Sequence, residues 1–184
     1  VLTTVVMIES NLARQVKNDM PAHAPAFFFI DIQPNQVEAF ETTVRAVPGV
    51  LGIDRVPHLR GRISKIAGIP ADQAVIAPDA QWVMRSDRGV TYAVRPPAGA
   101  EIVAGEWWPE DYRGPPLLSF DANAAKGMGI GVGDMLTINV LGREIEARIA
   151  NLRRIEWSTL GVNFTIILSP GVLESAPQTH IAAV

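Results

Sequence analysis

The 184-residue sequence contains no cysteine. This absence excludes disulfide bonds, thiolate catalysis, and zinc or iron–sulfur centres that are held by cysteine. It leaves the compartment open, because oxidising and reducing surroundings both tolerate a chain without cysteine. The sequence also lacks any stretch of about 18 or more apolar residues, the length that a membrane-spanning helix requires. We therefore expect no membrane span within it.

An excess of charge of either sign is missing as well. Lys and Arg number 16 against 19 Asp and Glu, which leaves a net charge of -3. Nucleic-acid-binding domains usually carry a basic stripe, and modules that bind anionic membrane surfaces carry basic clusters. The near balance of charge therefore predicts no nucleic-acid partner and no polybasic membrane contact.

Motifs for metals, cofactors and catalysis are also missing. His23, His58 and His180 are far apart, and none belongs to an HxxxH or HExxH pattern. No serine lies in a G-x-S-x-G elbow. Glycines alternate from Gly127 to Gly133, but they follow a predicted helix and precede a predicted strand, which reverses the order of a phosphate-binding loop. We predict no catalytic residue, metal ligand or cofactor, and we interpret the glycines as a turn.

The N-terminal region has the periodicity of a helix over residues 3–20. Val5, Ile8, Leu12 and Val16 are spaced by three or four residues and form a narrow apolar stripe. Such a helix either packs on the core or continues as a stalk from a membrane span. The apolar opening at residues 1–6 favours the stalk, because it has the composition of the end of a longer hydrophobic segment.

A β-α-β-β order follows. Residues 27–32 are predicted as a buried strand, a helix runs from Pro34 to about Ala46, and residues 50–56 and 62–66 are predicted as two strands. The inward face of the helix consists of Val37, Phe40, Val44 and Val47. This order predicts an α+β sandwich with a helix on one face of a sheet.

The second half is predicted to be richer in strands. Residues 68–101 are irregular, with short strand candidates at 81–84 and 90–94, and we interpret them as an inserted lobe. A strand at 101–104, a helix capped by Asp121, and strands at 164–168 and 179–184 follow. Between them, alternation at 135–141 and from residue 145 predicts a hairpin with one solvated face. Its Glu144 and Glu146, like Glu110 and Asp111 in a loop, are interpreted as surface carboxylates.

Three aromatic residues, Trp107, Trp108 and Tyr112, form a candidate partner or ligand surface. Adjacent residues at the end of a strand point to opposite sides, so one tryptophan is expected in the core and the other partly exposed. An exposed tryptophan beside prolines is typical of a contact surface. The other interpretation, which we favour, is that both rings pin the loop to the sheet.

Several motifs in order resemble the periplasmic core domain of FtsX-like and MacB-like ABC transporter permeases. They are EIVAGEWW at residues 101–108, AAKGMGIGVGDMLTI at 124–138, IEWSTLGVNF at 155–164 and SPGVL at 169–173. The last two are similar to the signature of the YbbP-type branch. The resemblance covers most of residues 25–184, with Met128 where the family usually has leucine.

The resemblance implies an organisation for the chain. Residues 1–24 would be a stalk helix that continues from a transmembrane span, residues 25–67 and 101–184 a porter-like α/β sandwich lobe, and residues 68–100 a smaller, mostly β inserted lobe. The domain would lie on the periplasmic side of the inner membrane. In the family another helix and strand follow the last strand, so we expect a lobe truncated at its C-terminus, with an exposed sheet edge near residues 179–184.

The resemblance also implies a function. The domain would couple ATP hydrolysis by a cytoplasmic ABC ATPase subunit to movement or extraction of a lipid-like or lipoprotein substrate, or to signalling to an extracytoplasmic partner. No catalytic residue follows from it. Two alternatives stay open: a non-catalytic structural or interaction module of a larger envelope complex, and a hydrolase without a recognisable motif, which requires a pocket with convergent polar groups.

Overall fold

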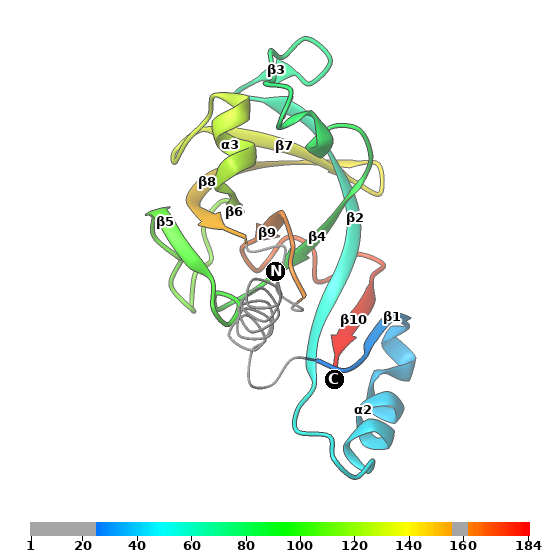
Figure 1. Ribbon diagram of the computed structural model, residues 1–184. Coiled ribbons are helices and arrows are strands. Elements are labelled where there is room, and N and C mark those ends of the chain that lie inside the picture. The colour runs from blue at the N-terminus through cyan, green and yellow to red at the C-terminus, as the bar shows by residue number, and fades with distance from the viewer. Residues whose placement is uncertain (1–24, 156–161) are drawn as a thin grey trace, which may run out of the picture.

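The computed structural model describes residues 25–155 and 162–184. The predicted N-terminal helix, its role as a stalk and His23 lie outside these residues. The described residues form a mostly β structure with few helices (Figure 1). No helix within these two ranges is long and apolar enough to cross a membrane.

Six strands close on themselves into a small barrel (Figure 1). In the order in which each pairs with the next, they are β2 (Asp54–Ile66), β4 (Arg88–Tyr92), β9 (Ile166–Leu168), β6 (Leu117–Asp121), β8 (Arg143–Arg154) and β7 (Met135–Val140). Pairing of β7 with β2 closes the ring. The β4–β9 and β6–β8 pairs are parallel, and the others are antiparallel. The predicted porter-like sandwich is therefore not confirmed, because these strands wrap around one core.

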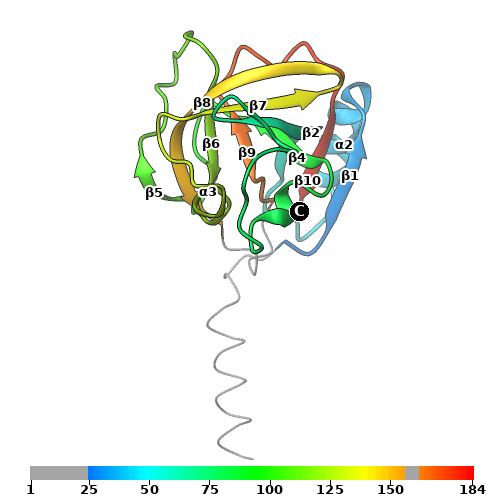
Figure 2. The same ribbon diagram turned by 90° about the horizontal axis from the view of Figure 1, so that it is seen from above.

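Smaller elements attach to the barrel. In chain order they are β1 (Phe28–Ile32), the 3-10 turn η1 (Pro34–Gln36), α2 (Val37–Arg45), β3 (Ile69–Pro70), the 3-10 turn η2 (Gln81–Val83), β5 (Glu101–Gly105), α3 (Ala122–Met128) and β10 (Thr179–Ala183). β10 pairs with the first part of β2, and β1 pairs with β10. β5 pairs with the last part of β8. Figures 1 and 2 show β1 and α2 on one side of the barrel and β5 on the other.

The hairpin predicted from alternation is confirmed as β7 and β8. Leu136, Ile138 and Val140 point into the core from β7, and Ile145, Ala147 and Ile149 do so from β8. The buried strands predicted at 164–168 and 179–184 are confirmed as β9, which is fully buried, and β10. The core thus lies inside the ring of strands and is built from their inward residues.

The helix predicted at Asp121 is confirmed as α3. The Asp121 carboxylate accepts a hydrogen bond of 2.7 Å from the Ala124 amide and so caps the first turn. Gly129 ends the helix in the left-handed conformation, with φ of 67°. Gly133, with φ of 96°, then leads into β7. The glycine run is therefore the helix cap and turn that its context predicts.

Residues 54–56 and 62–66 do not form two strands, as predicted, but belong to one strand, β2, and residues 50–53 lie in the loop before it. Pro57 lies within this strand and does not interrupt it. Pro57 pairs with His180 of β10, and its carbonyl accepts a 2.7 Å hydrogen bond from the Thr91 hydroxyl. A second prediction, a strand at 81–84, is also wrong, since these residues form the turn η2.

The strand predicted at 27–32 exists as β1, but its burial was predicted wrongly. Among its apolar residues only Ile32 is buried, and the side chain of Ile30 is 74% exposed. The helix that follows, α2, also contains no buried residue. Val37, Phe40 and Val44 of its expected inward face are half-buried, whereas Val47 is exposed.

Residues 68–100 do not stand apart from the rest of the barrel. They supply β4, which pairs with β2 and β9. Val83 and Val90 from this segment are buried in the same core cluster as Leu118 and Ile138. The division of the chain into a lobe of residues 25–67 and 101–184 and an inserted lobe of residues 68–100 stays a prediction.

Candidate functional site

The three predicted aromatic residues lie in the loop between β5 and β6. The rings of Trp107 and Trp108 stack against each other, with centroids 4.2 Å apart and planes inclined by 33°. Each indole N–H donates a 2.9 Å hydrogen bond to a carbonyl that follows β4, that of Val94 for Trp107 and that of Ala93 for Trp108. The expectation that the rings point to opposite sides is wrong. β5 ends at Gly105, whose φ is 72°, so the alternation of a strand does not extend to the tryptophans.

The stacked tryptophans fix this loop to the barrel. Trp108 is 4% exposed and packs with Leu117, Phe164 and Ile167, while Trp107 and Tyr112 are half-buried at the border of this cluster. The Tyr112 hydroxyl donates a 2.7 Å hydrogen bond to the Pro115 carbonyl and closes the turn. These contacts favour the pinning role. A partner or ligand surface at Trp107, Trp108 and Tyr112 stays a prediction.

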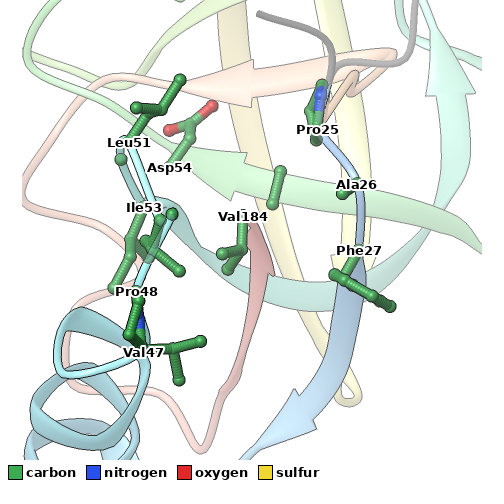
Figure 3. Close-up of a pocket in the computed structure, with 13 residues that line it drawn as sticks. Pro25, Ala26, Phe27, Val47, Pro48, Leu51, Ile53, Asp54 and Val184 are labelled. Carbon is green, nitrogen blue, oxygen red and sulfur yellow. The ribbon is translucent and has the colours of Figure 1, made fainter.

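An apolar groove lies at the other side of the molecule (Figure 3). Its volume is about 980 Å³, and it is lined by residues 25–27, the loop 47–54 between α2 and β2, and the end of β10. Figure 3 shows Val47, Leu51 and Ile53 on one side, Phe27 on the other and Val184 between them. Among the lining residues that the structure describes, Asp54 is the one with a charged side chain. We call this site the apolar groove.

The apolar surface continues from the groove onto β1. Phe27, Phe28 and Ile30 are exposed there, and Leu51 in the groove is 82% exposed. An apolar patch of this kind usually marks an interaction site. β10 is not the sheet edge that was expected near residues 179–184, since it lies between β1 and β2. The edge is β1 instead. Truncation of the lobe after Val184 stays a prediction.

Sequence reasoning missed the groove. The apolar run at residues 26–30 was the available signal, but a short apolar run fits a buried strand as well as an exposed one. The loop residues Val47 and Leu51 gave no separate signal. The groove exists because three segments that are distant in sequence meet around Val184.

A second, smaller pocket of about 250 Å³ contains the polar groups His58, Asp87, Arg88 and Asn163. A hydrolase requires a pocket with convergent polar groups, and this pocket contains several such groups. The Arg88 guanidinium donates to the carbonyls of Trp82 and Val83 and lies over the Trp82 ring, 5.1 Å from its centroid. Asp87 forms an ion pair of 3.2 Å with Arg62. The charged groups of this pocket are thus engaged in structural contacts.

The structural surroundings of His58, Glu110 and Glu144 lower the pKa values of these side chains. Burial, with a smaller effect of Arg60, lowers the pKa of His58. A hydrogen bond from Arg95 lowers the pKa of Glu110, and one from Lys65 lowers that of Glu144. Within residues 25–155 and 162–184, no three His, Asp or Glu side chains are grouped as metal ligands.

A buried polar cluster that the prediction missed joins β6 to β8. Arg153 is 3% exposed, and it donates hydrogen bonds of 2.6 Å to the Ser119 hydroxyl and 2.8 Å to the Phe164 carbonyl. Ser119 in turn donates to the Asn151 side chain, whose amide donates to the Glu106 carbonyl. Burial lowers the pKa of Arg153 to about 10, although the charge of Asp121 opposes this shift. The cluster connects β6, β8 and the segments that flank β5 and β9.

Comparison with known proteins gives a whole-length similarity. No family model matches the chain. Over 185 aligned positions the chain is 24% identical to the uncharacterized ABC transporter permease YbbP from Escherichia coli strain K12. The alignment covers 99% of this chain but 21% of the relative, so the chain spans about a fifth of that protein's length. The chain is therefore similar, over nearly its whole length, to one part of an ABC transporter permease.

Proposed function

We propose that this chain is the extracytoplasmic domain of an FtsX-like, YbbP-type ABC transporter permease. The observation that carries the proposal is the similarity to a named ABC transporter permease over 99% of the chain. The motifs around Trp107 and Gly133, which resemble the domain of such permeases, agree with the match to the YbbP permease. The domain lies on the periplasmic side of the inner membrane in this proposal.

In this role the domain transmits mechanical work and performs no chemistry itself. A cytoplasmic ABC ATPase subunit hydrolyses ATP, and the movement reaches this domain through residues 1–24, which act as a stalk. The domain then moves or extracts a lipid-like or lipoprotein substrate, or signals to an extracytoplasmic partner. The described polar groups support a non-catalytic role, because Arg88, Asp87 and Arg153 are held in structural contacts.

Two surfaces can meet such a substrate or partner. The described lining of the apolar groove offers aliphatic and aromatic side chains and one charged side chain, Asp54, which suits an apolar ligand or an apolar segment of a protein. The second surface is the half-buried part of Trp107 and Tyr112. The proposed inserted lobe, residues 68–100, contains the exposed strand β3, which lies away from both surfaces (Figure 1).

Labelling of the full-length permease tests the location. These 184 residues contain no cysteine, so an introduced cysteine is the one thiol of the permease once any cysteines outside them have been replaced by serine. With Asp72→Cys, at an exposed loop position, a membrane-impermeant maleimide should react in intact spheroplasts. Ala80→Cys is the matched control, because Ala80 is buried and should react only after denaturation. Reaction of Asp72→Cys only after lysis would place the domain in the cytoplasm and contradict the proposal.

A further inference from the structure

Few contacts hold α2 on the rest of the molecule. None of its nine residues is buried. Phe40 makes an edge contact with Phe29 of β1, with ring centroids 5.0 Å apart. A helix of this length is not stable by itself in water and depends on packing against its neighbours. The remaining contacts of α2 with the sheet therefore decide whether it stays in place.

A chain of three polar side chains provides such a contact. Arg55 of β2 donates from Nε to the Glu41 carboxylate of α2 at 2.7 Å, and its Nη1 lies 2.9 Å from Nδ1 of His180 on β10. Arg55 pairs with Ala182, two residues from His180, so both side chains lie on the same face of the sheet. The contact joins three elements that are distant in sequence.

We propose that Glu41, Arg55 and His180 form a pH-sensitive latch that holds α2 on β2 and β10 while His180 is neutral and releases it when His180 is protonated. Arg55 has only donors, so Nδ1 must accept, which requires the imidazole proton to be on Nε2. Protonation puts a second proton on Nδ1. Two donors and two positive charges then face each other, and Arg55 loses its fixed position between β10 and α2.

The charges around His180 support this assignment. Two charges act on His180, those of Arg55 on β2 and Glu41 on α2. The other charged residues on the adjoining elements are Glu38 and Arg45 on α2, Asp54 on β2, and Asp31 next to Ile32, the β1 partner of His180. Burial and Arg55 lower the pKa of His180, whereas Glu41 acts in the opposite direction. The neutral form is therefore favoured in the folded state, and the latch weakens as the pH falls below 6.5, the ordinary value for histidine.

Release of the latch would act on the apolar groove. The loop 47–54 directly follows α2 and forms one wall of the groove. Val37, Phe40 and Val44, now half-buried beneath the helix, would become more exposed. Acidification would thus change the shape of the groove from the side of α2 while leaving the barrel intact.

Hydrogen exchange of the 184-residue chain tests the latch. Exchange of residues 37–45 is compared at about pH 7.5 and about pH 5, after correction for intrinsic rates, with α3 as the internal reference. Exchange of α2 should be faster at about pH 5 than at about pH 7.5. The ratio of the two rates should be about tenfold for each unit by which the pKa of His180 in the latched state lies below its pKa in the released state. The protection of α3 should decrease less than that of α2, and only by as much as the whole molecule loses stability over this pH range. Equal protection of α2 at both pH values would overturn the proposal.

Two variants separate His180 from other titrating groups. His180→Asn keeps an acceptor near the position of Nδ1 but cannot be protonated, so the pH dependence of α2 should disappear while its protection near pH 7.5 remains. His58→Asn is the matched control, because it removes the other described histidine, and it should keep the dependence. His180→Gln serves as a second acceptor if the asparagine variant folds poorly. A pH dependence that persists in both His180 variants would overturn the proposal.

Discussion

Gly61 has less space for a side chain than Gly89, the other glycine in the six barrel strands. Gly61 pairs with Arg88 of β4 on one edge of β2 and with Val140 of β7 on the other. A Cβ at this position would lie 2.8 Å from a methyl group of Val90 and 3.0 Å from methyl groups of Ile138 and Val140. The absence of a side chain here lets β2 pass between two strands that both contribute to the core.

Gly61→Ala should therefore destabilise the domain by about 1–3 kcal/mol, because three core side chains must move to admit one methyl group. Urea denaturation followed by tryptophan fluorescence measures the change. Gly52→Ala is the control, since a Cβ there meets nothing within 4 Å and no positive φ is imposed. Its stability should change by less than about 0.5 kcal/mol. If the two variants are equally stable, the packing around Gly61 is looser than described.

At the scale of elements, the loop after β5 depends on two tryptophans in different environments. Both indoles donate to carbonyls that follow β4, but Trp108 is buried against Phe164 whereas Trp107 is half-buried. The pair thus combines an internal anchor with a ring at the surface. Trp108 therefore serves to pin the loop, and Trp107 is the tryptophan that retains ring surface for a contact.

Substitution by phenylalanine should reveal the asymmetry. Trp108→Phe loses buried ring atoms and the hydrogen bond to Ala93, and should cost about 1–3 kcal/mol of unfolding free energy. Trp107→Phe should cost less than about 1 kcal/mol, because its ring remains partly in water. Chemical denaturation of both variants measures the difference. Equal losses would mean that Trp107 is as much an anchor as Trp108.

Some elements could be predicted from the sequence because their signals are local. Alternation identified the β7–β8 hairpin, and Asp121 identified the start of α3. The same alternation in β8 extends from Ile145 to Asn151 and Arg153, so it could have predicted the buried polar cluster. Composition argues the other way at this position, because arginine is rarely buried unless its charge is paired. The burial of Arg153 is possible because Ser119 and the Phe164 carbonyl accept its protons.

At the scale of the whole molecule, closure of the barrel could not be predicted. It requires pairing of β4 with β9 and of β6 with β8, which are distant in sequence, and local periodicity contains no information on such partners. The exposure of β1 has the same origin. Phe28 and Ile30 have the composition of a buried strand, yet their side chains are exposed on β1, which pairs with β10. The groove beside them could not be predicted for this reason.

The free energy of unfolding of the whole molecule should decrease as the pH falls, because of His58 and His180. Burial is the largest cause of the lowered pKa values of His58 and His180. A base whose pKa is lower in the folded state takes up a proton more readily when unfolded. Its contribution is complete above the ordinary value of 6.5 and is lost as the pH falls toward the folded value. Glu41, Glu110 and Glu144 have lowered pKa values too, so their contributions decline only below 4.5.

We therefore expect the urea midpoint of the 184-residue chain to be constant from about pH 8 to about pH 7 and to fall between about pH 6.5 and about pH 5, before the carboxylates titrate. The double variant His58→Asn, His180→Asn should have a constant midpoint over the upper range and over the histidine range. Its midpoint should fall only at lower pH, where the ion pairs of Glu41, Glu110 and Glu144 are protonated. A wild-type midpoint that does not change down to pH 5, or an equal fall in the double variant, would show that neither histidine is coupled to folding. A fall in wild type that His180→Asn alone removes would instead locate the coupling at α2, because His58 lies in the barrel strand β2 and does not contact the latch.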